Sequence, residues 1–223
     1  MFGNVFILGD SYSTFEGYIP EKNVFYYNEN GPYYLISHPE MNRAENDVCK
    51  AEQTWWYDIS TSLGTLAVND SWSATTICNT GYNGADNKDI SFVARLDKRI
   101  AEGYFEKNKI DTVFLFGGTN DSWADAPLGN KVYADWTDED LYCVLPAFSY
   151  LVNRLVSNVP DAKIYCIINF SLKDEIADFY EEVCNQNGVG AIRLGQLDTV
   201  YDHPTVIGMA QIKEYIMDYV EKN

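Results

Sequence analysis

Short runs of large apolar residues alternate along most of the chain with segments whose apolar positions recur every three or four residues. The runs end in turn residues, which is the pattern of strands buried on both faces. We expect five such strands, at residues 4–9, 63–70, 111–118, 163–169 and 189–195. The helical periodicity predicts helices at residues 53–63, 89–107, 137–159, 173–187 and 205–221.

This order of elements predicts an α/β fold. Strands that are separated by helices pair in parallel, and their crossovers are right-handed, so helices cover both faces of the sheet. The expected architecture is a three-layer α/β/α sandwich with about five mostly parallel strands. Ligands of such sheets bind beyond the carboxyl ends of the strands. Ser11 directly follows the first predicted strand and therefore falls in the expected site.

Two stretches, at residues 14–54 and 121–136, interrupt the alternation. They have little periodicity, and loops of this length in a compact domain usually carry function or are disordered. We interpret residues 1–223 as a single domain with these two long loop insertions. Aromatic residues gather in and beside the insertions, where they either bury a small core or stack on a substrate. They are Phe15, Tyr18, Phe25, Tyr26, Tyr27, Tyr33, Tyr34, Trp123 and Trp136.

Composition narrows the choice of partners. The 16 Lys and Arg against 33 Asp and Glu give a formal net charge of −17. Such a field repels phosphate backbones and anionic lipid, so we expect neither nucleic acid nor a membrane as a partner. The chain has 5 cysteines without a CxxC pair, which favours free thiols. With no recognisable signal peptide at residues 1–10, we expect a cytoplasmic protein, or a secreted one if a leader has been removed.

Three polar residues follow strands or begin a helix at the expected site. Ser11 ends the Gly-Asp-Ser turn, Asn120 follows the third strand, and His203 precedes the last helix. A serine hydroxyl becomes a nucleophile when a base such as neutral imidazole accepts its proton. Each residue type is also common in ordinary turns. The other histidine, His38, lies in the first insertion and is expected at the surface.

The segments "GDSYS", "GTND" and "HPT..G", in this order, resemble those of the SGNH (GDSL-type) hydrolases. The resemblance implies a flavodoxin-like fold and ester hydrolysis without a cofactor. It implies Ser11 as nucleophile and His203 as general base. It also implies that the oxyanion is bound by the Ser11 backbone N–H, a glycine N–H and the Asn120 side chain. The G-x-S-x-G elbow of the α/β-hydrolases is absent around Ser11.

The chain departs from this family pattern in its glycine block. "NDSWSATT" places Ala74 where the family has the glycine, and Gly81 and Gly84 are the alternatives. If the position requires a positive φ, alanine costs roughly 1 kcal/mol.

The second departure concerns the acid that orients the histidine. The family places an aspartate three residues before the histidine, where this chain has Val200. Asp198 is our preferred substitute and Asp202 the alternative, while a backbone carbonyl could also orient the ring and leave a dyad. Asp10 belongs to the same signature, and we expect it to bond the backbone of the turn.

We therefore expect a serine esterase for short-chain acyl esters, such as acetyl esters, of small molecules or carbohydrate. The alternative is a non-catalytic carbohydrate-binding relative of the same fold. A nucleotide-binding protein is disfavoured by the absence of a glycine-rich phosphate loop and by the charge. We expect no metal site, because Asp121, Asp125 and Asp135 lack ligand spacing and are interpreted as a solvated acidic face.

Overall fold

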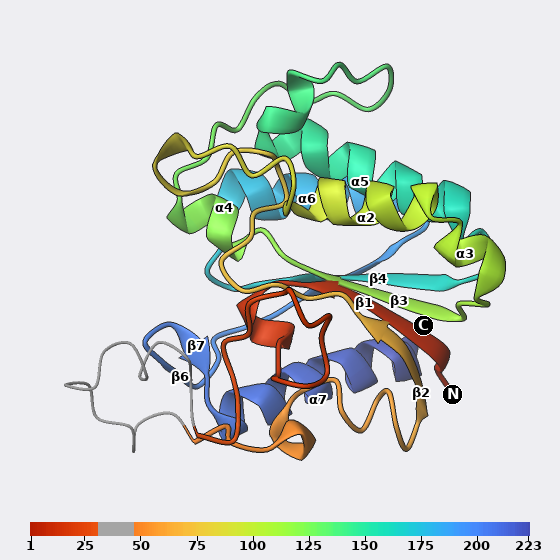
Figure 1. Ribbon diagram of the computed structural model, residues 1–223, viewed down its shortest axis with the longest axis vertical. Helices are drawn as coiled ribbons and strands as arrows, with labels where there is room; N and C mark the ends of the chain where they lie inside the picture. The colour runs from red at the N-terminus through yellow and green to blue at the C-terminus, as the bar shows by residue number, and fades with distance from the viewer. Residues whose placement is uncertain (31–46) are drawn as a thin grey trace.

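The computed structural model describes residues 1–30 and 47–223. Its centre is a five-stranded sheet in the order β2-β1-β3-β4-β5, and every neighbouring pair is parallel (Figure 1). The strands are β1 (Gly3–Gly9), β2 (Gly64–Asn69), β3 (Thr112–Phe116), β4 (Lys163–Ile168) and β5 (Gly190–Arg193). The predicted α/β fold with a parallel five-stranded sheet is confirmed.

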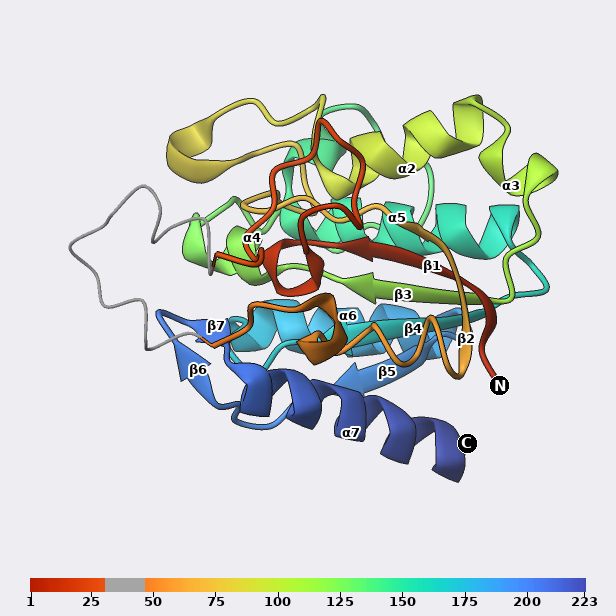
Figure 2. The same cartoon turned by 60° about the horizontal axis from the view of Figure 1, so that its bottom comes forward.

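Helices cover both faces of this sheet. One face carries α2, α5 and α6, and the other carries α7 together with irregular segments (Figure 1). The helices are α2 (Phe92–Ala101), α3 (Tyr104–Lys107), α4 (Thr119–Trp123), α5 (Val144–Asn158), α6 (Asp174–Gln186) and α7 (Val206–Lys222). Figure 2 shows both termini at the end of the sheet where the parallel strands begin, so the opposite edge is left to the loops.

Alternate residues of each strand supply the two cores. In β1, Phe6 and Leu8 pack toward α2, whereas Val5 and Ile7 pack toward α7. This is the period of two that a strand buried on both faces requires. The Trp55 and Trp56 side chains are buried in the core on the α7 side.

The prediction of a helix at residues 53–63 is wrong. This segment forms a short 3₁₀ turn, η3 (Ala51–Gln53), followed by irregular turns. The hydroxyl of Ser60 donates to the carbonyl of Trp56 and that of Thr61 to the carbonyl of Tyr57. Such side-chain bonds to the backbone compete with a regular helix.

Two other predicted helices are shorter than expected. The helix at 89–107 divides into α2 and α3 at Gly103, whose φ is +65°. In the helix predicted at 137–159, Thr137 and Asp140 exchange hydrogen bonds like those of a helix cap, but the turn that follows them is only the 3₁₀ turn η5 (Asp140–Tyr142). The helix α5 starts only at Val144, because Pro146 lacks the N–H that a helix continuing from η5 would need.

A hairpin that the sequence analysis did not predict precedes α7. It pairs β6 (Thr199–Val200) with β7 (His203–Pro204) in antiparallel fashion, and Val200 faces His203. The two turn residues, Tyr201 and Asp202, have φ values of +49° and +59°. Positive φ at both central positions is the geometry of a type I′ turn, which is common in two-residue hairpins.

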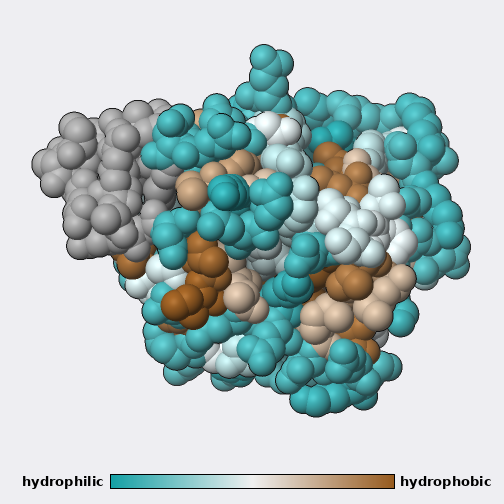
Figure 3. Space-filling view, turned by 90° about the horizontal axis from the view of Figure 1, so that it is seen from below, coloured by the Kyte–Doolittle hydropathy of each residue, from teal (hydrophilic) through white to brown (hydrophobic). Residues whose placement is uncertain are grey.

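The surface seen from the α7 side is mostly hydrophilic, with separate small apolar areas (Figure 3). Ile207 of α7, 60% exposed, is the most exposed large aliphatic side chain beyond the first residue in the described part of the chain. No helix among residues 1–30 and 47–223 is both long and apolar enough to span a bilayer.

Candidate active site

The nucleophile candidate Ser11 lies at the carboxyl edge of the sheet, in the 3₁₀ turn η1 (Ser11–Ser13) that follows β1. Asp10 caps this turn, because its Oδ1 accepts the backbone N–H of Tyr12 over 3.1 Å. Burial raises the pKa of the Asp10 carboxyl to about 7. Asp10 thus bonds the backbone of the turn, as the sequence analysis expected, and Ser11 is held at its first position.

His203 meets Ser11 across 192 residues of sequence. Its Nε2 lies 2.9 Å from Ser11 Oγ, and its Nδ1 lies 2.9 Å from the carbonyl oxygen of Tyr201. A carbonyl only accepts hydrogen bonds, so Nδ1 carries the proton of the neutral ring. The lone pair therefore lies on Nε2, where it accepts the Ser11 hydroxyl, which is the arrangement a general base requires.

Aromatic rings enclose the His203 imidazole. Tyr26 stacks on it at a centroid distance of 3.6 Å, and Tyr12 and Trp123 lie at 5.3 and 5.9 Å. Burial among these rings lowers the pKa of His203 to about 4, while the bond to the Tyr201 carbonyl opposes the shift. Since a lowered pKa favours the uncharged ring, His203 is free to accept a proton at neutral pH.

The low pKa of His203 sets the acid limit of any activity that uses it as a base. Hydrolysis needs the neutral ring, so activity is lost as the pH falls through the pKa of the folded protein. We expect the limb of kcat/KM that reflects His203 to have its midpoint near pH 4, well below the pKa of about 7 of the Asp10 carboxyl. An ordinary histidine would give this limb near pH 6.5. Steady-state kinetics from pH 8 down to about pH 4 provide the measurement, with Asp10→Asn as a control that removes the titration of this carboxyl and should leave the limb near pH 4 unchanged.

Neither carboxylate proposed for the triad contacts His203. The Asp198 carboxylate accepts the Thr205 hydroxyl, and the His203 Nδ1–H is directed to the Tyr201 carbonyl instead. Asp202 touches the site only through its backbone carbonyl, which accepts the Tyr12 hydroxyl. The hairpin turn explains the difference, because its tight reversal brings the Tyr201 carbonyl within 2.9 Å of His203 Nδ1, where it takes the place of a carboxylate. The Asp198 and Asp202 assignments are therefore corrected to a backbone carbonyl.

This arrangement predicts that Asp198→Asn and Asp202→Asn each lower kcat/KM by less than about 10-fold. Loss of the carboxylate in a Ser-His-Asp triad costs about 10⁴-fold. Ester hydrolysis by both variants, each matched to the parent by melting temperature, provides the measurement. A loss of 10³-fold in either well-folded variant would show that a carboxylate supports His203 in solution.

Asn120 lies at the start of α4, directly after β3, and is 2% exposed. Its Nδ2 donates to the Thr75 carbonyl over 3.0 Å, which places the amide beside the turn that follows β2. Among the residues described, none accepts a hydrogen bond from the backbone N–H of Ser11 or of Ala74. The three expected oxyanion donors therefore follow the adjacent strands β1, β2 and β3. Each has an N–H without an acceptor among the described residues.

Ala74 has a φ of +62°, in the left-handed region that glycine prefers. The position therefore does require a positive φ, which a glycine would adopt without strain. Gly81 and Gly84, the alternatives, lie farther along the chain, at the edges of the 3₁₀ turn η4 (Tyr82–Gly84).

Ala74→Gly is expected to stabilise the protein by about 1 kcal/mol, because glycine removes the cost of a left-handed alanine. Ala85 provides a matched control, since it is also exposed but has a φ of −61°. Ala85→Gly should destabilise slightly through the entropy of the unfolded chain. Urea denaturation of both variants gives the measurement, and equal effects would contradict the assigned strain.

Arg95 is a buried residue of the site that the sequence analysis missed. Its guanidinium donates to the Gly9 carbonyl over 3.2 Å and to Thr75 Oγ1 over 3.1 Å, and it also bonds the Asp70 carbonyl. It therefore joins the loops that carry Ser11 and Ala74. Its sequence signal was an arginine within the apolar stripe of the helix predicted at 89–107.

The interpretation of Asp121 as part of a solvated acidic face is wrong. Asp121 is fully buried and accepts the backbone N–H groups of Ile77 at 2.8 Å and Cys78 at 3.2 Å. Burial raises its pKa to about 6. Asp125 and Asp135 are exposed, as expected. Because Asp121 follows Asn120, its bonds fix the start of α4 against the loop after β2.

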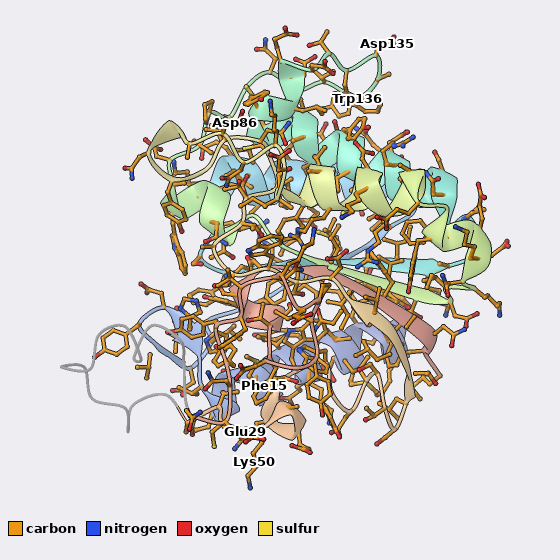
Figure 4. All side chains as sticks on the ribbon, in the orientation of Figure 1. Phe15, Glu29, Lys50, Asp86, Asp135 and Trp136 are labelled. Carbon is orange, nitrogen blue, oxygen red and sulfur yellow. The ribbon has the colours of Figure 1, made fainter. Side chains whose placement is uncertain are left out.

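The aromatic residues of the insertions divide between core and site. Phe15, Tyr26 and Tyr27 are buried, whereas Trp123 is 37% exposed beside His203. Trp136 instead packs on α5, where its Nε1 donates to Ser149 Oγ over 2.9 Å (Figure 4). Tyr33, Tyr34 and His38 lie outside the described residues. No cluster of His, Cys, Asp or Glu suited to a metal occurs in the part of the chain that is described.

Comparison with known proteins agrees with the family that the sequence motifs resemble. The chain resembles a protein of Bacteroides ovatus described as a GDSL-like lipase, with 39% identity, full coverage of both chains and a TM-score of 0.86. It also resembles one of Bacteroides uniformis with the same description, at 40% identity over 99% of this chain and 96% of that one, with a TM-score of 0.86.

A family two carbohydrate esterase of Clostridium thermocellum shares the fold at 17% identity, with a TM-score of 0.64 over 99% of this chain and 64% of that one. No curated protein sequence matches the chain. The model of the GDSL-like lipase/acylhydrolase family matches residues 3–220. With nearly its whole length matched, the chain belongs to the GDSL-like lipase/acylhydrolase family.

Proposed function

We propose that the protein is a serine esterase that hydrolyses short-chain acyl esters through an acyl-enzyme on Ser11. The observation that carries this proposal is the 2.9 Å contact between Ser11 Oγ and His203 Nε2, with the ring held in the correct tautomer by Tyr201. Membership of an acylhydrolase family supports it.

The proposed reaction has two halves. The Ser11 Oγ forms a bond to the ester carbonyl carbon while its proton passes to His203 Nε2. The resulting oxyanion accepts hydrogen bonds from the Ser11 and Ala74 N–H groups and from Asn120 Nδ2. The bond to the leaving oxygen then breaks, and His203 returns the proton to the alcohol. Water repeats these steps on the acyl-enzyme, releasing the carboxylic acid and free Ser11.

A hydroxyl group of a carbohydrate is our proposed leaving group. Trp123 supports it, because an exposed indole 5.9 Å from the His203 ring offers a flat apolar surface to a sugar face. The carbohydrate esterase named above shares only the fold with this chain. A Trp123→Ala variant should raise KM for an acetylated sugar more than KM for p-nitrophenyl acetate.

The test is a series of p-nitrophenyl esters from acetate to octanoate, together with a fluorophosphonate probe. We expect activity to fall as the acyl chain lengthens and the probe to label Ser11, located by mass spectrometry of peptides. A folded protein that neither hydrolyses the esters nor takes up the probe would instead be a non-catalytic binding relative.

A further inference from the structure

The loop between β2 and α2 brings to the site a side chain that no sequence motif indicated. Tyr82, the first residue of η4, donates its hydroxyl to Asn120 Oδ1 over 2.8 Å. Its ring is 37% exposed, whereas Asn120 is 2% exposed. The segment "NTGYNG", considered above only for its glycines, therefore reaches the oxyanion donor through its tyrosine.

The hydrogen bonds of Asn120 fix which end of its amide faces which neighbour. The Thr75 carbonyl can only accept, so Nδ2 must face it, at 3.0 Å. Oδ1 then faces Tyr82, and the phenol must be the donor of that bond. One N–H of Nδ2 remains without a partner among the described residues, and this is the group that an oxyanion would accept.

Tyr82 remains a donor at every pH at which an esterase is ordinarily assayed. Burial, with a further contribution from the charges of Asp10 and Asp121, raises the pKa of its phenol to about 12. The hydrogen bond to Asn120 therefore does not titrate near neutral pH.

The loop that carries Tyr82 is itself anchored. Gly81 N donates to the Ala85 carbonyl over 2.7 Å, and Thr80 Oγ1 donates to the Tyr142 carbonyl over 2.7 Å. The Tyr142 hydroxyl donates to Asp86 Oδ1 over 3.3 Å, on the outer part of this loop (Figure 4). Tyr82 is therefore held in place independently of Asn120 and can act as a fixed support.

We propose that Tyr82 is a positioning residue that orients the Asn120 amide for the oxyanion. The proposal rests on the proposed function, because it assumes that Asn120 binds an oxyanion. Without the hydroxyl, the amide keeps only its bond to Thr75, and the buried Oδ1 loses its donor. A donor that must reorganise during the reaction stabilises developing charge less than one fixed beforehand.

The test is the kinetics of Tyr82→Phe, which removes only the hydroxyl. We expect kcat to fall by about 10-fold with KM within twofold, a part of the 10²–10³-fold that loss of a whole oxyanion donor costs. In an Asn120→Ala background, the same change should have no further effect, since the two residues act through one donor. Tyr142→Phe removes a hydroxyl of η5 that bonds only the outer part of this loop, at Asp86, and it keeps the backbone carbonyl that anchors Thr80, so it should leave kcat unchanged.

A second readout does not depend on activity. The side-chain NH₂ resonances of Asn120 in a ¹H–¹⁵N spectrum should shift and broaden in Tyr82→Phe but not in Tyr142→Phe. Unchanged resonances and kcat in Tyr82→Phe, or a full additional loss in the Asn120→Ala background, would overturn the positioning role. Absence of any Ser11-dependent hydrolysis in the parent would refute the proposed function, while the spectra would still report whether Tyr82 orients the amide.

Discussion

Replacing Ser11 by alanine is expected to lower kcat/KM for p-nitrophenyl acetate by at least about 10⁴-fold. The change removes the hydroxyl oxygen that lies 2.9 Å from His203 Nε2. In a serine protease, loss of the nucleophile or of the base alone costs about as much as loss of the whole triad, about 10⁶-fold, because the residues act as a unit. The effect expected here is smaller, by up to about 100-fold, because an activated ester reacts more readily without the nucleophile.

Because Ser11 and His203 act as a unit, His203→Ala and a double variant test the mechanism more sharply than Ser11→Ala alone. His203→Ala should lose a similar amount of activity, and the double variant Ser11→Ala/His203→Ala should lose no more than either single variant. Asp202→Asn, which changes the neighbouring side chain, serves as the control. Melting temperatures separate loss of chemistry from loss of fold. Comparable turnover by well-folded Ser11→Ala would refute an acyl-enzyme on this residue.

The positions of Ser11, Asn120 and His203 could be expected from the sequence because the fold itself brings them together. Ser11 and Asn120 each follow a buried apolar run, and β1 and β3 are neighbours in the parallel sheet. The carboxyl ends of such strands meet at one edge, so residues 109 apart in sequence share a site. Thr205 marked the start of the last helix, and its hydroxyl accepts the N–H of Gly208 there.

The support of His203 could not be expected in the same way. It depends on the carbonyl of Tyr201, and backbone groups are identical in every sequence. The hairpin that aims this carbonyl has tyrosine and aspartate where Asn-Gly is typical, so no turn motif indicated it. A sequence motif indicates side chains only, so it pointed to Asp198, whose carboxylate instead accepts the hydroxyl of the cap residue Thr205.

Strained backbone accumulates around the site. Six described non-glycine residues have positive φ, and four of them lie in the loops that carry the oxyanion donors and the base. These four are Ala74, Asn83, Tyr201 and Asp202. Such conformations cost about 1–3 kcal/mol each and persist where the surroundings enforce them. The Tyr12 hydroxyl, bonded to the Asp202 carbonyl, and the guanidinium of Arg95, bonded to Thr75, supply that enforcement here.

Asn120→Ala is expected to lower kcat by about 10²–10³-fold while KM changes little. The amide N–H meets charge only when the carbonyl oxygen becomes an oxyanion, so its loss destabilises the transition state rather than bound substrate. The Ser11 and Ala74 N–H groups remain, which is why the loss should be smaller than that of the nucleophile. Steady-state kinetics with p-nitrophenyl acetate provide the measurement.

Two further experiments test whether the effect of Asn120→Ala on kcat comes from lost stabilisation of the oxyanion. Asn120→Asp keeps the shape of the side chain but places a carboxylate near the oxyanion, so it should lose at least as much activity as Asn120→Ala. A boronic acid that forms a tetrahedral adduct with Ser11 should bind Asn120→Ala more weakly, in proportion to the loss in kcat, because it imitates the transition state. If Asn120→Ala instead keeps more than about a tenth of the parent kcat with a native melting temperature, the amide is not an oxyanion donor, given the usual size of that effect. In that case the two backbone N–H groups bind the oxyanion alone, and the hydrogen bonds of Asn120 to Thr75 and Tyr82 only join the loops.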